Sequence, residues 1–532
     1  MNNVSDKLKV ALILDNLEIC KWQKDALDYA KDLIDIRVIL NCQNTKIDRN
    51  LKKHFLYYLL NFLSLKNKKT IKEYFKPRNT IIENFYSDYE LGWQIIPKKN
   101  LNVLKAENIT VVIKFGMNLL KINDELSSFN IFSFHHGNPS KYRGRPAGFY
   151  EILNNEKKVG VIVQLLSNGI DKGDVYAFSE AQIFNYSYKK TAISFFSISR
   201  FMLRDAVLNF RTKSPIQLKK SGRNFKLPSN LLVIFFFLKI ISNFTKRITY
   251  GLFFEKKWKV ALSSEKINLS KETRLSAENF SALPINNKYN FYADPFFTND
   301  GKYLRLEALK KFSGLGDLLE IDINNFKVQK VLFSGNHYSY PFSFCYDNEE
   351  YLLPEVASHS SPYFLNVSKG DGKKIYIRGL EEKRIVDTTL LNYRGYIYLF
   401  FGERRDAQNV LNLWISKSLR DNFSPHPSTP ICINPSFARM GGSIIVEEGL
   451  LYRFGQNNEN KYGEHINIMK ILEISPQDYK EIPCGSISIS GFMGPHTVNL
   501  NTNLKKIVLD YYEEKFSLFA GYRRLISKLL RK

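Results

Sequence analysis

The sequence predicts two folds in one chain: an open α/β sheet followed by an all-β five-bladed propeller. Two observations lead to this prediction. Up to about residue 213, apolar runs typical of buried strands alternate with helical segments, which is the pattern of a mostly parallel sheet. Beyond residue 256, short strand patterns are separated by turns rich in Asn, Asp and Gly, and a motif recurs about every 50 residues. That interval fits one four-stranded propeller blade.

The length of the chain also requires more than one domain. A chain of 532 residues is far longer than one hydrophobic core usually serves. Changes in composition along the chain set the expected boundaries. We predict an α/β domain, a basic and apolar helical linker, the propeller, and a basic amphipathic C-terminal helix, at residues 1–213, 214–256, 257–512 and 513–532, respectively.

The strands expected in the α/β domain are residues 8–15, 36–40, 108–115, 129–134 and 159–165. Residues 21–32 are expected to form a helix, and residues 51–76 a basic, apolar helical stretch that covers the sheet or contacts a partner. A ligand is expected at the carboxyl ends of the strands. The first strand is not followed by a Gly-x-Gly-x-x-Gly loop, which argues against a nucleotide-binding Rossmann domain.

The linker contains an unbroken apolar run at residues 231–238, which is too short to cross a bilayer. Basic residues flank the run: Lys219, Lys220, Arg223, Lys226, Lys246 and Arg247. This pattern indicates either a helix that lies in a membrane interface or a linker helix packed between two domains. The basic stretch at residues 521–532 allows the same two interpretations.

The repeat in the propeller half consists of related short motifs that contain Asp-Pro-Phe, Tyr-Pro-Phe or small polar residues. Its five members are residues 293–296, 339–342, 386–390, 437–441 and 494–498. Five repeats at this interval predict five blades.

The overall charge and the cysteines limit the partners and the compartment. The formal net charge of +25 favours acidic partners such as an anionic membrane surface, although a Lys-rich compositional habit of an AT-rich genome explains it equally well. The five cysteines are widely spaced, so neither a disulfide framework nor a cysteine zinc site is expected. The N-terminus resembles a first strand rather than a signal peptide. We therefore expect a cytoplasmic protein without a bound metal.

One segment of the α/β domain combines residues that carry chemistry. His135 stands at the carboxyl end of an expected strand and is followed by a loop rich in Gly and Pro. Asp171 stands in a Gly-Ile-Asp-Lys-Gly turn after the next strand, so it can come close to His135. Such a pair can exchange protons near neutral pH. The alternative interpretation is a purely structural His beside a turn Asp.

These residues resemble the formyltransferase family, which includes methionyl-tRNA formyltransferase, glycinamide ribonucleotide formyltransferase and the sugar N-formyltransferases. The family has a strand that ends in Asn-x-His, a loop that ends in Tyr-Arg-Gly, and an Ile/Leu-Asp-x-Gly-Asp turn about 35 residues later. Here the His is His135, the loop ends at residues 142–144, and the turn is residues 170–174. Ser133 stands where the family has its Asn. The resemblance covers about residues 8–212.

The resemblance implies transfer of a formyl group from 10-formyltetrahydrofolate to an amine. It implies that His135 stabilises the developing oxyanion, and that Asp171 orients His135 and helps to remove the amine proton. The family Asn helps to bind that oxyanion, so Ser133, with a shorter arm, is expected to take part, and His136 or Asn138 can compensate. The resemblance also implies pterin binding by Phe115, Gly116, Met117, Leu119 and Leu120; the alternative is a strand end and helix start without ligand contact.

The propeller half resembles the N-terminal domain of plant glucosamine inositolphosphorylceramide transferases and the five-bladed glycoside hydrolase propellers. In those hydrolases, carboxylates near the propeller axis act as base and acid. The corresponding candidates for binding a substrate or glycan here are Asp294, Glu355, Asp387, Arg439 and His496. Glu355, Glu403 and Glu464 all qualify as the acid. Hydrolysis, glycan or glycolipid binding, and scaffolding all stay open for this half.

Together these observations predict a cytoplasmic enzyme, peripheral at the inner membrane face, that formylates an amino sugar during the synthesis of surface polysaccharide or glycolipid. The acceptor would be a small molecule, an amino sugar linked to a nucleotide or a lipid. The alternative is a propeller-centred glycan-binding protein or carbohydrate-active enzyme with a vestigial formyltransferase domain. A tRNA acceptor is the weaker third option, since the propeller occupies the place of the family's small barrel, so no nucleic-acid partner is expected. A homodimer is left open.

Overall fold

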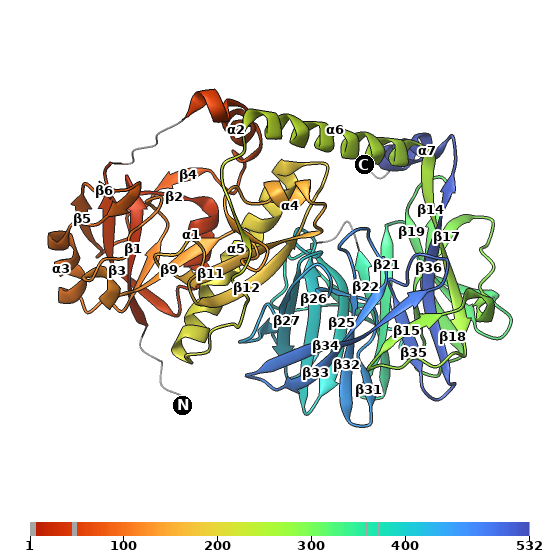
Figure 1. Ribbon diagram of the computed structural model, residues 1–532. Coiled ribbons are helices and arrows are strands. Elements are labelled where there is room, and N and C mark those ends of the chain that lie inside the picture. The colour runs from red at the N-terminus through yellow and green to blue at the C-terminus, as the bar shows by residue number, and fades with distance from the viewer. Residues whose placement is uncertain (1–6, 45–49, 357–359, 371, 531–532) are drawn as a thin grey trace. The chain divides into compact units, whose positions relative to one another are not determined.

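Figure 1 shows the computed structural model of the chain, which describes residues 7–44, 50–356, 360–370 and 372–530. The chain divides into two compact units, Met1–Phe244 and Thr245–Lys532. The first unit contains the expected open α/β sheet and the second contains the expected five-bladed propeller.

The sheet of the first unit is parallel at its centre. Its strands follow the order β12, β11, β9, β8, β1, and then β3 and β5. Neighbours from β9 to β5 pair in parallel, whereas β11 and β12 are antiparallel additions at one edge. The bounds are Leu8–Asp15 for β1, Ile34–Cys42 for β3, Ile81–Phe85 for β5, Val111–Lys114 for β8, Asn130–His135 for β9, Lys158–Leu165 for β11 and Val175–Gln182 for β12.

Helices cover both faces of this sheet. Helices α1 (Lys21–Tyr29) and α5 (Tyr188–Arg211) pack together, and α5 lies against β11 and β12. The opposite face forms a core with α3 (Lys98–Ala106), in which Ile13 packs with Leu101 and Leu104. The short helix α4 (Phe149–Leu153) follows the loop after His135. The carboxyl ends of β1, β8 and β9 therefore meet at one edge, where the sequence predicts the ligand site.

The basic stretch at residues 51–76 is only partly helical. Helix α2 covers Leu51–Ser64, but Lys72–Tyr74 forms strand β4 and pairs with β2 (Glu18–Cys20). Lys72 Nζ lies 2.8 Å from Glu18 Oε2 across this pair. A neighbouring strand end thus supplies backbone partners that the local apolar pattern does not reveal, and the helix prediction is wrong for this part.

The linker contains a helix longer than its apolar run. Helix α6 spans Asn230–Phe253, and the division between the two units falls inside it. Its first half belongs to the first unit: Phe236 is fully buried and stacks on Phe149, with ring centroids 4.3 Å apart. Strand β13 (Arg223–Phe225) of the linker pairs with β10 (Tyr142–Gly144). No helix among the described residues is long and apolar enough to cross a membrane.

Five sheets of the second unit form the blades. The first blade contains β17 (Tyr289–Phe297), β18 (Tyr303–Lys310), β19 (Gly316–Asp322) and β20 (Val328–Phe333), and the second contains β21 (Tyr338–Tyr346), β22 (Glu349–Val356), β23 (Tyr363–Asn366) and β24 (Lys374–Tyr376). The third contains β25 (Ile385–Tyr393), β26 (Tyr396–Glu403), β27 (Val410–Ser416), β28 (Ser424–Pro425) and β29 (Cys432–Ile433), and the fourth contains β30 (Arg439–Met440), β31 (Ile445–Glu447), β32 (Leu450–Gln456), β33 (Ile466–Ile474), β34 (Tyr479–Ile489) and β15 (Glu272–Leu275). The last blade contains β35 (Val498–Asn501), β36 (Lys506–Phe516), β14 (Phe254–Ser263) and β16 (Ser281–Ala282). Helix α7 (Ala520–Leu530) follows β36.

The last blade closes the ring by joining the two ends of the propeller. Strand β14 opens the propeller and pairs antiparallel with β36, from Phe254 opposite Phe516 to Ser263 opposite Ile507. The first and last strands thus share one sheet, which leaves no free edge between them.

The repeated motif visible in the sequence corresponds to a bulge in the first strand of a blade. In three blades the strand register shifts at the motif, and Asp294, Tyr340 and Asp387 each have a positive φ of 44–50°. A bulge re-aims the backbone and side chains at that point. Each bulge N–H donates to a carboxylate: Asp294 to Asp510, Tyr340 to Asp294, and Asp387 to Glu355. Each of these bonds joins one blade to the preceding blade.

Candidate functional site

The first candidate site lies at the carboxyl edge of the N-terminal sheet. His135 ends β9, and Asp171 stands in the turn after β11 with a φ of 50°. Their Nδ1 and Oδ2 atoms are 3.3 Å apart, and the side chains are 9% and 15% exposed. The structure thus brings together the two residues that the sequence predicts to form a pair.

The loop that ends in Tyr-Arg-Gly holds this pair in place. The Gly144 N–H donates to Asp171 Oδ2 at 2.7 Å, and Gln164 Nε2 donates to Asp171 Oδ1 at 3.2 Å. His135 Nε2 lies 3.2 Å from the carbonyl oxygen of Tyr142. Both ring nitrogens of His135 therefore face oxygen acceptors, an arrangement that is satisfied when both carry a proton.

Gly137 is required by the close approach of this loop to His135. A Cβ at position 137 would lie 2.6 Å from His135 Nε2 and 3.1 Å from the carbonyl oxygen of Tyr142. Any side chain here would displace the imidazole or the loop, so Gly137 allows His135 to stay in contact with Asp171. The small cavity beside His135 has a volume of about 10 Å³ and is lined by Arg143, Tyr150 and their neighbours. A ligand much larger than a water molecule therefore needs this loop to open.

A row of polar side chains crosses the sheet next to the pair. Ser133 in β9 is in register with Lys114 in β8 and with Gln164 in β11. Because strand residues alternate between faces, Ser133 and His135 share one face of the sheet with Lys114 and Gln164. Gln164 Oε1 is buried without a hydrogen-bond partner among the described residues, so it can accept a bond from a ligand N–H.

Lys114 is a site residue that sequence analysis missed. Burial lowers the pKa of its ammonium to about 8, and the charges of Asp15 and Asp171 act in the opposite direction. Its Nζ donates to the carbonyl oxygen of Asn118 at 3.0 Å. The available signal was a lysine that ends an otherwise apolar strand, Val-Val-Ile-Lys, at the edge where ligands bind.

Of the two residues expected to compensate for Ser133, the structure places His136 away from it. His136 lies on the opposite face of the sheet, with its ring 5.3 Å from that of Trp22 and its Nε2 2.9 Å from Ser199 Oγ. Burial lowers the pKa of His136 to about 3, which keeps its ring neutral. Asn138 Oδ1 accepts hydrogen bonds from the N–H and hydroxyl of Ser140 and so stabilises the loop. Alternation along the strand explains why His136 points away from Ser133, whereas compensation by the Asn138 amide N–H stays a prediction.

The predicted pterin-binding segment is irregular backbone, and no helix begins there. Phe115 packs against Trp22, at 5.9 Å between ring centroids. Met117 and Leu120 are buried in the sheet core, whereas Leu119 is 41% exposed. Gly116 permits a close approach, since a Cβ would lie 2.6 Å from the backbone N of Asp15. Pterin binding by these residues stays a prediction. Because Met117 and Leu120 are buried, a pterin would contact mainly the backbone of this segment and Leu119.

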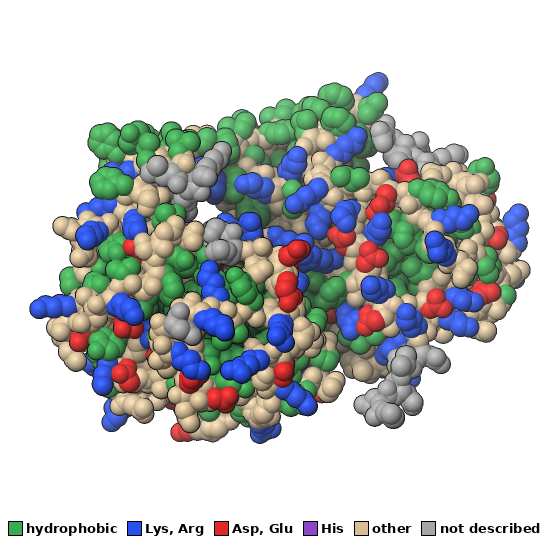
Figure 2. Space-filling model, turned by 180° about the vertical axis from the view of Figure 1, so that it is seen from behind, with side chains coloured by type: hydrophobic (Ala, Val, Ile, Leu, Met, Phe, Trp, Pro, Cys, Tyr) green, Lys and Arg blue, Asp and Glu red, His purple; other side chains and the backbone are tan. Residues whose placement is uncertain are grey.

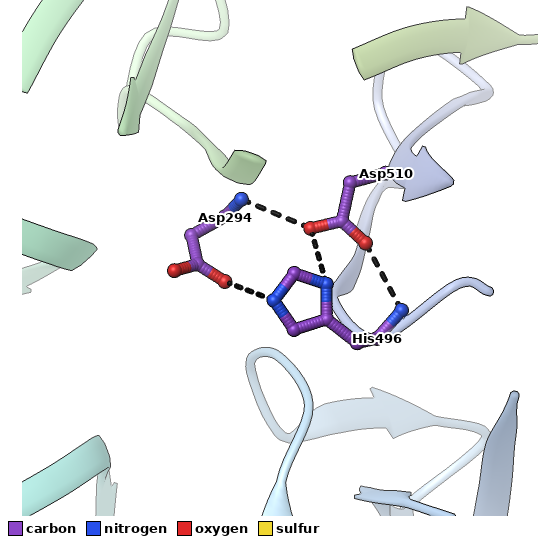
Figure 3. A group of neighbouring side chains, drawn as sticks. All are labelled: Asp294, His496 and Asp510. Atoms are coloured by element: carbon purple, nitrogen blue, oxygen red, sulfur yellow. Dashed lines mark hydrogen bonds and ion pairs between the residues drawn. The ribbon is translucent and has the colours of Figure 1, made fainter. Parts of the chain in front are cut away.

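The second candidate site lies where the propeller closes. Figure 3 shows His496 between two carboxylates, with Nε2 3.1 Å from Asp294 Oδ1 and Nδ1 2.8 Å from Asp510 Oδ2. Thr497 Oγ1 also donates to Asp294 Oδ1 at 2.8 Å. Sequence analysis predicted Asp294 and His496 but missed Asp510, an isolated acid in the apolar run Ile-Val-Leu-Asp-Tyr-Tyr of β36.

Electrostatics keep this group charged. Burial alone would lower the pKa of His496, but Asp510 and Asp294 raise it to about 10. Burial likewise opposes ionisation of Asp294, but the charge and hydrogen bond of His496 lower its pKa. The ligand atoms of the three residues lie within 4.8 Å of one another, as in a candidate metal centre. The two carboxylates and the protonated imidazole form an ion-paired group where the propeller closes.

The remaining predicted propeller residues form an adjoining group. Arg439 Nε is ion-paired with Asp387 Oδ2, to which Gln456 Nε2 donates at 3.2 Å. Glu355 accepts the Asp387 N–H at 3.1 Å. Burial, together with the charge of Asp387, raises the pKa of Glu355 to about 8, so this carboxyl is protonated at neutral pH.

Of the three acids considered, only Glu355 belongs to this group. Glu403 is paired with Lys383 and Arg405 at 3.1 and 2.9 Å. Glu464 accepts a hydrogen bond from Asn460 at 3.0 Å. These partners hold both side chains in other contacts, whereas Glu355 adjoins Asp387. Burial raises the pKa of Asp387 as well, while the charge of Arg439 opposes that shift.

Comparisons with known proteins agree with the two-part organisation. Residues 280–491 match the model of the family described as glucosamine inositolphosphorylceramide transferase 1, N-terminal. The glucosamine inositolphosphorylceramide transferase 1 of Oryza sativa subsp. japonica is 30% identical over 219 residues, 38% of this chain and 29% of that protein. Its Arabidopsis thaliana counterpart is 28% identical over 215 residues, 36% of this chain and 27% of that protein. The chain thus spans less than a third of these relatives.

Formyltransferases are also among the similar proteins. The methionyl-tRNA formyltransferase of Finegoldia magna is 30% identical over 104 residues, 18% of this chain and 34% of that protein. The structures found include glycinamide ribonucleotide transformylase 1 from Symbiobacterium toebii (12% identity, TM-score 0.29, 42% of this chain and 95% of that one). Another is a 4-N formyltransferase from Francisella tularensis (13% identity, TM-score 0.27, 41% and 76%). Both resemblances stated from the sequence, to the formyltransferases and to the plant transferases, therefore have a match among known proteins.

The charged closure group predicts that the propeller loses stability at high pH. His496 has a pKa near 10 in the folded protein against an ordinary value of 6.5. Its contribution to the stability of the propeller is therefore complete below about pH 6.5 and is lost as the pH rises towards 10. His496→Gln should flatten this dependence and, because it leaves Asp294 and Asp510 buried without a counter-charge, cost about 3–5 kcal/mol at neutral pH. Thermal unfolding of both proteins between pH 6 and 10 measures this.

His465→Gln is the matched control, because it replaces a partly exposed His of the same unit. It should follow the wild-type pH dependence. Identical curves for His496→Gln and the wild type would contradict the ion-paired closure.

Proposed function

We propose that the N-terminal α/β part, about residues 1–213, transfers a formyl group from 10-formyltetrahydrofolate to the amine of an amino sugar linked to a nucleotide or a lipid. The observation that carries this proposal is the His135–Asp171 contact at 3.3 Å, made by the residues that match the family motif. The similarity to a methionyl-tRNA formyltransferase supports the reaction class. The acceptor class is supported by the relatives of the propeller, which are named as transferases of glucosamine, an amino sugar, and of a ceramide lipid.

The residues of the site fit a folate donor and an amine acceptor. Gln164 Oε1 is a buried acceptor without a partner among the described residues, which suits an incoming N–H. Leu119 and the irregular backbone around Gly116 would hold the pterin ring. The bound cofactor would supply an activated formyl carbon to a neutral amine.

The protein's own groups would then manage charge and protons. His135 would hold a proton towards the oxygen that becomes negative as the formyl carbon is attacked, while Asp171 orients the imidazole. Asp171, or a water that it binds, would accept the proton that leaves the amine, and this proton would pass to the folate nitrogen as the bond from that nitrogen to the formyl carbon breaks. Because the Tyr142 carbonyl faces His135 Nε2, the substrate oxygen would take the place of that carbonyl when the loop opens.

The proposal also places the protein in the cytoplasm at an anionic membrane face. All five cysteines are free, which suits a reducing compartment. Figure 2 shows hydrophobic side chains gathered along the top edge, where α2 and α6 run in Figure 1. The first unit exposes two sets of apolar residues here: Leu51, Phe55, Leu59, Phe62 and Leu63 from α2, and Leu231, Ile234, Phe235, Leu238 and Ile241 from α6. A homodimer and the absence of a nucleic-acid partner stay predictions.

A second candidate function is carbohydrate chemistry in the propeller, with a vestigial formyltransferase domain. The observation that favours it is the protonated Glu355 next to the Arg-paired Asp387. Against it, the paired partners neutralise Asp387 and Asp294, which suits glycan binding or scaffolding as well as hydrolysis.

Removal of either member of the catalytic pair tests the first candidate. His135→Ala and Asp171→Asn should lower formyl transfer by about 10²–10⁴-fold, because each removes positioned proton transfer. The assay follows tetrahydrofolate release with nucleotide-linked amino sugars as acceptors, and circular dichroism checks the fold. Glu355→Gln serves as the control in the other unit and should leave transfer unchanged.

The outcomes separate the two candidates. Full transfer by His135→Ala or Asp171→Asn would sink the catalytic assignment. Sugar release by the wild type that Glu355→Gln abolishes, with no formyl transfer by any protein, would establish the propeller as the active part.

We infer that Lys114 compensates for Ser133. Its strand position beside Ser133 and its charge near Asp171 suit a cation that stabilises developing negative charge. Lys114→Met keeps most of the volume but removes the charge, so kcat should fall by about 10²–10³-fold with little change in KM. Adding Ser133→Asn should restore part of the loss. An unchanged kcat in Lys114→Met, with transfer otherwise intact, would contradict this role.

A further inference from the structure

A basic cavity lies in the second unit, beside the first strand of the propeller. Its volume is about 400 Å³, and its walls come from β14, the start of β17, the turn after β18, and α7. Six cations line it: Lys256, Lys257, Lys311, Arg523, Arg524 and Lys528. Glu255 is the one acid in the lining. An excess of this size around one hollow attracts an anion.

The two arginines fix the wall of the cavity. Arg523 Nε donates to Glu255 Oε1 at 2.7 Å, which neutralises the only lining acid. Arg524 donates to the carbonyl oxygens of Gly251 and Phe254, at the end of α6 and the start of β14. These contacts hold α7 against the propeller, so the remaining charge comes from the lysines.

The lysines differ in their acidic partners: Lys257 Nζ lies 3.2 Å from Glu255 Oε2, the other oxygen of the carboxylate that Arg523 binds. Lys311 and Lys528 have no ion-pair partner among the residues that the structure describes. Lys256 Nζ donates to the carbonyl oxygen of Tyr462 at 3.0 Å and lies 4.1 Å from the centre of the Tyr512 ring. Burial lowers the pKa of Lys256 to about 8, although the charges of Glu514 and Glu464 act in the opposite direction. A bound anion would offset this cost.

Exposed apolar side chains surround the same cavity. Phe312, in the turn directly after Lys311, is 84% exposed. On α7, Tyr522, Leu525 and Leu529 are each more than half exposed and follow one face of the helix. Arg524 and Lys528, four residues apart, line the cavity from another face. Apolar residues beside a row of cations are typical of a helix that lies in a membrane interface.

We propose that this cavity binds the phosphate group of an anionic membrane lipid, with Phe312 and the apolar face of α7 in the surrounding interface. The proposal is independent of formyl transfer. A soluble phosphate would account for the cations but not for the apolar rim. A second copy of the chain would bring two positive cavities together in a symmetric contact, which is unfavourable.

Vesicle binding by the full chain tests this proposal. We compare co-sedimentation with vesicles of phosphatidylcholine alone and of phosphatidylcholine mixed with phosphatidylglycerol. Lys311→Gln/Lys528→Gln should weaken binding to the mixed vesicles by roughly 30-fold, since each lysine near the surface contributes about fivefold. Phe312→Ser should also weaken it. The control Lys330→Gln/Lys480→Gln changes the same charge on exposed strand positions of the same unit and should stay within about twofold of wild type.

Several results would overturn the proposal. Equal losses in both double variants would mean diffuse surface attraction. Calorimetric binding of glycerol 3-phosphate without vesicle binding would mean a soluble phosphate ligand. A wild type that sediments with neither vesicle, or a dimer in size exclusion that Phe312→Ser dissociates, would assign the surface to another occupant.

Discussion

Carboxylates that accept backbone N–H groups hold both candidate sites together. In the first unit, Asp171 accepts the N–H of Gly144, and Asp15 accepts that of Met117. In the second unit, three carboxylates accept the N–H groups of the bulges, and so tie successive blades to one another. A hydrogen bond to a charged acceptor contributes about 1.5–3 kcal/mol, and one to a neutral carboxyl, such as the protonated Glu355, contributes less. Each such bond joins segments that are far apart in the sequence.

The same device leads to different chemistry in the two units. Asp171 remains partly exposed and contacts His135 at an edge of the sheet where a loop can open. In the propeller, Asp294 and Asp510 are buried and face the protonated His496. The first arrangement leaves a pair free to exchange protons, whereas the second holds charge in place. Glu355, protonated beside Asp387, is the propeller group least bound by ion pairs.

The fold could be predicted from the sequence because its signals are local and repeated. Apolar strands such as β1 and β11 appear as continuous runs, and the bulge motif marks the first strand of each blade. The pair of His135 and Asp171 was predictable because both follow strand ends. Strand β4 was not, because its partner β2 lies about 50 residues away in the chain. Asp510 and Lys114 were also missed, since each is a single charge in an apolar strand whose role depends on its neighbours in space.

Substitution of the family Asn by Ser133 is the point at which the sequence alone leaves the activity open. The structure places His136 on the opposite face of the sheet and brings Lys114 into the same row as Ser133. Whether the N-terminal site works as a transferase thus depends on the donors that Ser133, His135 and Lys114 supply.

The most direct test of this account is calorimetric binding of 10-formyltetrahydrofolate, or a stable folate analogue, to the full-length chain. The account predicts binding in the micromolar range, which His496→Gln, a change in the other unit, leaves unaltered at a pH where that variant is folded. No binding by a folded wild-type protein would contradict the central claim. The N-terminal site would then be vestigial, and the propeller would carry the function.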